Sequence, residues 1–76
     1  MKSKISLRSI EDVKEFVAIA TKCEFDIDVQ YNHIVLDGKS LVGMMNIELN
    51  RELTVYSKDT NSVFEAMLRK FERRNV

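Results

Sequence analysis

The residues of this chain that could do chemistry are few, and they lie in different parts of the sequence. His33 is the only histidine, Cys23 is the only cysteine, and Ser40 stands within the segment DGKSLVGMM, residues 37–45. Because histidine ordinarily titrates near neutral pH, His33 is a candidate acid, base or phosphoryl acceptor. No nucleophile paired with a base stands near His33 in the sequence, so a solvated turn residue is the better interpretation.

Neither the cysteine nor the acidic residues predict a metal or redox site. Cys23 stands at the end of a predicted helix, and a helix C-terminus does not activate a thiol, so a small, half-buried core residue is expected there. Glu24, Asp26 and Asp28 share one face of a predicted strand. Successive positions on that face lie roughly 6.6 Å apart, too far for three carboxylates to hold one cation. We therefore expect neither a metal ion nor a cofactor.

The segment 37–45 combines a hydroxyl at a predicted helix start with a lysine and two adjacent methionines. Flexible thioethers suit an adaptable protein-binding surface. A phosphate on Ser40 would meet free backbone N–H groups at the helix start, so the modified chain would stay folded. Ser40 is therefore a candidate modification site. The alternative interpretation is an ordinary N-cap serine followed by buried leucine and methionine side chains.

Seven short elements must position these residues. Apolar periodicity predicts a short strand at Ile5 and Leu7, a helix over about 10–22 capped by Ser9, a strand over 25–31 and its hairpin partner over 34–36. One or two helical turns after Ser40, a strand over 53–56 and a helix with an apolar stripe over 63–71 complete the chain. This order predicts an α+β fold in which helices cover one face of a mostly antiparallel sheet.

Length and charge exclude several functional classes. A chain of 76 residues forms a single domain, 1–76, whose small core leaves no room for a large enclosed active site, so we do not expect an enzyme. Twelve basic residues balance twelve acidic ones, which gives no general attraction to nucleic acid or anionic lipid. Without a signal-like or membrane-spanning apolar run, the chain is expected to be cytoplasmic.

The residues GKSLVGMM, 38–45, resemble the regulatory-serine region of HPr, the histidine-containing phosphocarrier of the sugar phosphotransferase system. Phe16, Val17 and Ala20, followed by the alternating strand from Phe25, resemble the first helix and second strand of that family, and ELTV at 52–55 resembles its last strand. The resemblance covers nearly the whole chain. It implies an open-faced β-sandwich, with a four-stranded antiparallel sheet covered on one face by three helices, in the order β-α-β-β-α-β-α.

The resemblance fails at the phosphoryl-acceptor loop. Phosphate-carrying members have a Gly-apolar-His-x-Arg-Pro-Ala loop before the first helix, whereas this chain has LRSIEDV at 7–13. Ser9 stands where the histidine would be, and Glu11 stands where the arginine would be. Serine cannot form a phosphoramidate, and glutamate repels phosphate where arginine would bind it. The resemblance therefore implies a variant that lacks the acceptor histidine.

Such a variant is similar to catabolite-repression HPr, which keeps the regulatory serine without the acceptor histidine. The resemblance implies that Ser40 is the candidate for phosphorylation, with Lys39 beside it, and that Leu41, Val42 and Met45 match the apolar positions that bind protein partners. It also implies that those partners are an HPr kinase/phosphorylase and a transcriptional regulator. Two alternatives stay open: a phosphocarrier that uses His33, and a structural interaction domain with neither chemistry. The sequence does not predict an oligomeric state.

Overall fold

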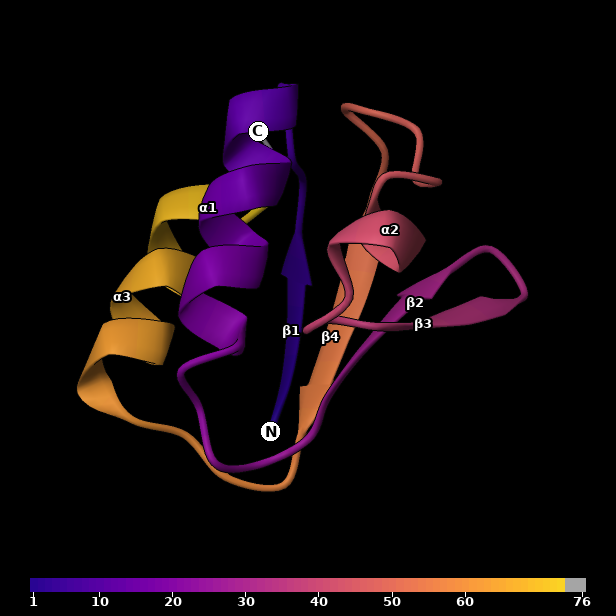
Figure 1. The fold of residues 1–76 in the computed structure, drawn as a ribbon. Helices are drawn as coiled ribbons and strands as arrows, with labels where there is room; N and C mark the ends of the chain where they lie inside the picture. Colours follow the sequence, from indigo (N-terminus) through magenta and orange to yellow (C-terminus); the bar gives the residue numbers. More distant parts are fainter. Residues whose placement is uncertain (74–76) are drawn as a thin grey trace.

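Alternating apolar residues build a four-stranded antiparallel sheet at the centre of the fold. The structure is a computed structural model that describes residues 1–73. Strand β1 spans Lys2–Ile5, β2 spans Ile27–Tyr31, β3 spans Ile34–Asp37 and β4 spans Leu53–Ser57. Their order in the sheet is β1-β4-β2-β3, so β1 and β3 form the two edges (Figure 1).

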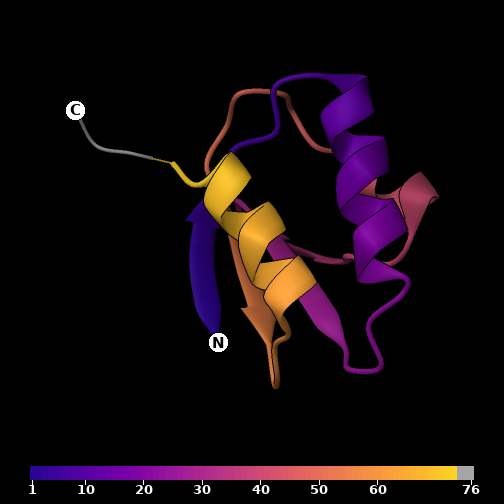
Figure 2. The same cartoon turned by 90° about the vertical axis from the view of Figure 1, so that its left-hand side faces the viewer.

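Three helices cover one face of this sheet. They are α1 at Ile10–Ala20, the single turn α2 at Leu41–Met44, and α3 at Ser62–Phe71 (Figures 1 and 2). Each begins at a side-chain cap: Ser9, Ser40 and Asn61 accept a hydrogen bond from the backbone N–H three residues further on. The predicted α+β fold, with its order β-α-β-β-α-β-α, is confirmed. No helix in the described part of the chain is long and apolar enough to span a membrane.

The core lies between the helices and one face of the sheet. Ile27 and Val29 of β2 and Leu53 and Val55 of β4 are buried there, while the residues between them point to the open face. The helices contribute these buried residues: Val13, Phe16, Val17, Ala20, Met44, Phe64, Met67, Leu68 and Phe71. A single apolar layer therefore holds the fold together, and the opposite face of the sheet meets water.

Several predicted boundaries are wrong, all where the chain turns. Helix α1 ends at Ala20 rather than at 22, because residues 21–23 continue only as tight turns. Strand β2 begins at Ile27 rather than at 25. Phe25 still joins the core, since its ring packs edge-on against Phe64 with the centroids 5.6 Å apart. The alternation that extended the predicted strand therefore reflects side-chain burial before the strand begins.

The first strand and the last helix also depart from expectation. Leu7 is buried but lies beyond β1, where its carbonyl accepts the N–H of Asn50. Val63, assigned to the apolar stripe of the last helix, is 62% exposed. Of the basic residues predicted at the end of that helix, Arg74 lies outside the described residues. Periodicity therefore located the later strands and both long helices, whereas the first strand lies at Lys2–Ile5, earlier in the chain than the predicted Ile5 and Leu7.

Gly38 ends the β2–β3 hairpin where the backbones approach closely. Its N–H donates to the Ile27 carbonyl at 2.8 Å, and a Cβ on Gly38 would lie 2.8 Å from Ile27 Cγ2. We expect Gly38→Ala to lower the free energy of unfolding by about 1 to 3 kcal/mol, because the new methyl group must displace a buried strand residue. Urea denaturation measures this loss.

Gly43→Ala is the matched control. A Cβ at Gly43 would meet only Ser40 atoms, at 3.3 and 3.5 Å, and alanine favours the helix. The Gly43 variant should therefore lose less stability than the Gly38 variant. Equal losses in the two variants would contradict the steric explanation.

Candidate functional site

The candidate site is built from the turn that leads into α2. The Asp37 carbonyl accepts the Ser40 N–H at 3.0 Å, and Asp37 Oδ1 accepts the Lys39 N–H at 2.9 Å. Ser40 then adopts an extended conformation, with φ −100° and ψ 109°, and its Oγ accepts the Gly43 N–H at 3.1 Å. One aspartate and one serine thus fix the start of the helix.

Lys39 connects this turn to the end of α1. Its Nζ donates to the Cys23 carbonyl at 2.8 Å, and the side chain is only partly exposed. The sequence placed Lys39 beside Ser40 but gave no sign of this contact, which spans 16 residues. The ammonium group therefore holds the α1–β2 connection against the α2 segment as well as flanking Ser40.

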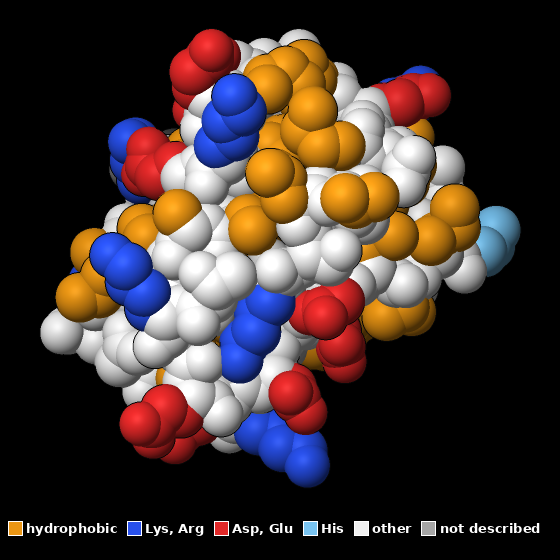
Figure 3. Space-filling view, viewed as in Figure 1, with side chains coloured by type: hydrophobic (Ala, Val, Ile, Leu, Met, Phe, Trp, Pro, Cys, Tyr) orange, Lys and Arg blue, Asp and Glu red, His pale blue; other side chains and the backbone are white. Residues whose placement is uncertain are grey.

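Three apolar side chains of this segment face solvent. Leu41 is 42% exposed, Val42 is 82% exposed and Met45 is 45% exposed, whereas Met44 is fully buried. We refer to Leu41, Val42 and Met45 as the α2 surface. Figure 3 shows hydrophobic side chains gathered over α2 and the segment that follows it. The alternative interpretation of this segment is an ordinary N-cap serine followed by buried leucine and methionine side chains. That interpretation is correct for Met44 and wrong for Leu41.

His33 lies at the tip of the β2–β3 hairpin, away from any constellation of reactive groups (Figure 3). Asn32 before it has φ 55°, which forms the predicted tight turn. His33 is exposed and makes no hydrogen bond or ion pair with the residues that the structure describes. The structure therefore places it as a solvated turn residue, without a neighbouring base or nucleophile.

The remaining candidates lie in ordinary structural positions. Cys23 belongs to the core, as predicted, but is buried rather than half-buried, and its Sγ lies 3.5 Å from the Ile19 carbonyl. Of the three acidic residues expected on one strand face, only Asp28 belongs to β2, because Glu24 and Asp26 precede the strand. Within residues 1–73, no three His, Cys, Asp or Glu side chains lie close enough to hold a metal ion.

The start of α1 carries acidic rather than basic groups. Ser9 Oγ accepts the Asp12 N–H at 3.1 Å, and Asp12 Oδ2 accepts the Arg8 N–H at 3.0 Å. Glu11 adds a second carboxylate to the first turn. The Ser9 hydroxyl thus caps the Asp12 N–H of the first turn, and the Asp12 carboxylate holds the residue before the cap.

Sequence reasoning missed a polar cluster beside the hairpin. Arg51 Nε donates to Glu48 Oε2 at 2.8 Å in the loop after α2, and Tyr31 of β2 lies beneath that loop. Burial, followed by the neighbouring Glu48 carboxylate, raises the pKa of the Tyr31 phenol. No local signal in the sequence joins Tyr31 to Glu48, because the contact depends on how the loop folds back.

This arrangement of strands and helices defines an HPr-like α+β sandwich. In sequence comparisons, no protein-family model and no curated protein matches the chain. Among solved structures, the chain resembles the crystal structure of a phosphocarrier protein HPr from Bacillus anthracis str. Ames, with a TM-score of 0.74 and 16% sequence identity. The match covers 95% of this chain and 96% of that chain. At this identity, the similarity establishes the fold that the two proteins share.

The Ser40 cap can be tested through stability. Ser40→Ala removes the acceptor for the Gly43 N–H and should cost about 1 kcal/mol of unfolding free energy, whereas Ser40→Asp keeps an acceptor and should cost less. Ser62→Ala is the matched control, because Ser62 is exposed in the first turn of α3 and the cap there is Asn61. Urea denaturation measures both variants, and equal free energies of unfolding for Ser40→Ala and Ser62→Ala would refute the cap.

The Tyr31 environment predicts a pH effect. The raised pKa means that the folded state favours the neutral phenol, so this contribution to stability is present below the ordinary tyrosine pKa of about 10 and is lost as pH rises through the folded value. Glu48→Gln should lower the pKa of Tyr31 in an NMR titration. Glu52→Gln, which removes a carboxylate paired with Lys4 instead, should leave it unchanged.

Proposed function

We propose that this chain is an HPr-like regulatory protein that binds protein partners through the α2 surface and does not relay phosphate through a histidine at the start of α1. The observation that carries this proposal is the exposure of Leu41, Val42 and Met45 around a partly exposed Ser40. Exposed apolar groups on a short helix suit a partner's apolar pocket. Because α2 is a single turn that buries only Met44, its other apolar side chains are left available to a partner.

Ser40 is the proposed control point of this surface. Phosphorylation would add a charge of about −1.5 to −2 immediately before the three apolar side chains. A partner that buries Leu41 and Val42 must then also pair or exclude that charge, so the modification would select between partners. Lys39 would stand directly before the phosphorylated residue, while its ammonium group is bonded to the Cys23 carbonyl. We propose an HPr kinase/phosphorylase as the modifying enzyme and a transcriptional regulator as the bound partner.

The start of α1 supports the loss of phosphorelay in this proposal. Ser9 occupies the cap, and the Asp12 carboxylate is already bonded to the Arg8 N–H. With Glu11 beside them, these groups repel an incoming phosphoryl group rather than bind it. The position equivalent to the family's acceptor histidine is assigned here from the sequence resemblance at Phe16 and Val17.

The phosphorylation proposal is tested with an HPr kinase/phosphorylase and ATP. Intact-mass spectrometry should show one added phosphate on the wild-type chain and none on Ser40→Ala, while the control Ser62→Ala should behave as wild type. No added mass on the wild type, or an added mass that persists in Ser40→Ala, would reject Ser40 as the site. Retained far-ultraviolet circular dichroism would confirm that the Ser40 variant is folded.

His33 carries the second candidate function. It is exposed and free of bonds to the described residues, so it is accessible to another protein. If it is a phosphoryl acceptor, phosphoenolpyruvate and enzyme I should give an acid-labile phosphate that disappears in His33→Ala. An unmodified wild-type protein would reject the carrier function. Failure of both phosphorylations would leave the structural interaction domain as the function.

A further inference from the structure

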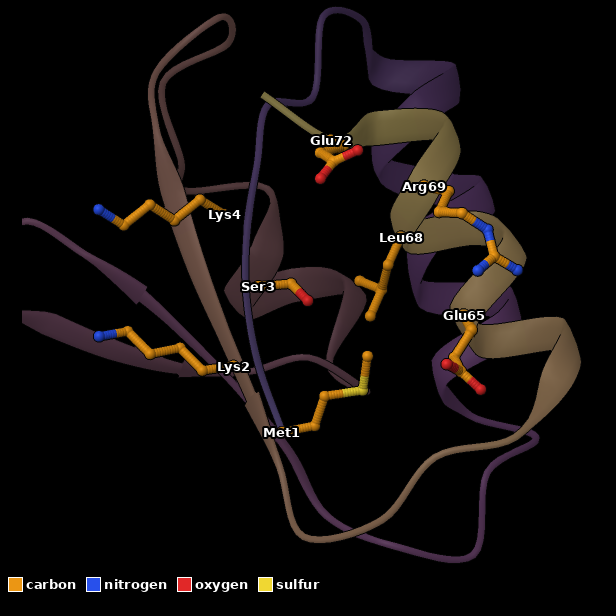
Figure 4. A pocket seen from close by; sticks show the side chains of 8 residues that line it. All are labelled: Met1, Lys2, Ser3, Lys4, Glu65, Leu68, Arg69 and Glu72. Carbon is orange, nitrogen blue, oxygen red and sulfur yellow. The ribbon is translucent and has the colours of Figure 1, made fainter. Parts of the chain in front are cut away.

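The two edge strands of the sheet, β1 and β3, differ in how they are protected against pairing with another chain. At β1, the Lys4 carbonyl accepts the Arg73 N–H at 3.0 Å, and Ile5 forms a bridge with Glu72, so part of the edge is covered by the chain itself. Lys2 and Lys4 project from the open face beside this edge (Figure 4). Lysines and a covering segment are common protections of an edge strand against pairing with another chain.

The outer edge of β3 has no comparable protection. The Gly38 N–H donates to the Ile27 carbonyl, and alternation along the ladder then turns the backbone groups of Leu36 and Ile34 toward β2. The N–H and C=O of Val35 and the N–H of Asp37 therefore point away from the sheet. These three groups have no backbone partner within residues 1–73, whereas the Asp37 carbonyl accepts the Ser40 N–H.

The side chains at this edge are apolar and exposed. Val35 is 65% exposed on the open face, and Ile34 is 53% exposed on the helical side. Both are β-branched residues, which favour strand pairing, and β3 contains neither lysine nor proline. The edge therefore offers both the backbone groups and the side chains that strand addition requires.

We propose that β3 pairs with β3 of a second copy of this chain in an antiparallel, two-fold symmetric dimer centred on Val35. In that register Val35 lies opposite the partner subunit's Val35, and Ile34 lies opposite the partner subunit's Leu36. Beyond the paired residues, Asp37 lies near the partner subunit's His33, which stands in the turn just before that strand. Each position thus meets a residue of matching chemistry: apolar with apolar, and a carboxylate with a ring N–H donor.

The existing ladder supports the same register. Asp37 lies directly opposite Asp28 of β2, so two carboxylates share the open face without a cation paired to either among the described residues. A histidine donor on the other side of Asp37 would relieve that repulsion. A two-fold axis at Leu36 would instead place Val35 opposite an aspartate, so an apolar side chain would face a carboxylate.

The dimer also arranges the proposed protein-binding surfaces. A two-fold axis through an antiparallel strand pair runs perpendicular to the sheet, so both helical layers lie on the same side of the joined sheet. Because α2 contacts β3, the two α2 surfaces flank the axis on that side. The ladder is short, which predicts a weak and reversible dimer rather than a permanent one.

Sedimentation equilibrium on the full chain, up to about 1 mM, tests association. The wild type should show a reversible monomer–dimer equilibrium. Val35→Lys should weaken it at least about tenfold, because two lysines would face each other at the axis. Val63→Lys is the matched control, since Val63 on α3 has the same residue type and nearly the same exposure, 62%; it should dimerise as wild type.

Three results would overturn the proposal. They are a monomer throughout the concentration range, a Val35→Lys variant that dimerises as strongly as wild type, and a Val63→Lys variant that loses dimerisation. Cross-linking tests the register separately. Val35→Cys should form a disulfide-linked dimer faster than Val63→Cys under mild oxidation, because paired strand residues have Cα atoms within disulfide reach. Equal rates for the two cysteine variants would reject the Val35 axis.

Discussion

The close approach of Gly38 to Ile27 determines where the exposed part of this molecule lies. Only a residue without a side chain lets the backbone donate to the Ile27 carbonyl at 2.8 Å and leave the sheet at that point. The bonds from Asp37 to Lys39 and Ser40 follow within the next two residues. The α2 surface is therefore positioned by the end of a hairpin, and its helix needs only one turn.

Because the fold has a single apolar layer, the three helices contribute to the core unequally. Helices α1 and α3 bury four residues each and cover most of the sheet, whereas α2 buries only Met44. A helix anchored by one side chain can present its other apolar residues outward without loss of the core. The fold thus separates stability, carried by α1, α3 and the sheet, from recognition, carried by α2.

Local chemistry in the sequence predicted the elements well. Ser9 and Ser40 were identified as caps because serine hydroxyls satisfy free N–H groups within three residues, and the structure confirms both. The prediction failed for Phe25, since a buried side chain and a strand residue leave the same alternating pattern. The bond from Lys39 to the Cys23 carbonyl could not be predicted, because it depends on how distant segments meet.

The bond between Lys39 and Cys23 also makes two distant parts of the chain mechanically dependent on each other. Cys23 ends the turns after α1, and Lys39 directly precedes the cap of α2. One ammonium group therefore links the segment that leads into β2 to the segment that leaves β3. Any partner that draws Lys39 toward itself must release the Cys23 carbonyl to water, so this bond adds a polar link to the packing between α1 and α2.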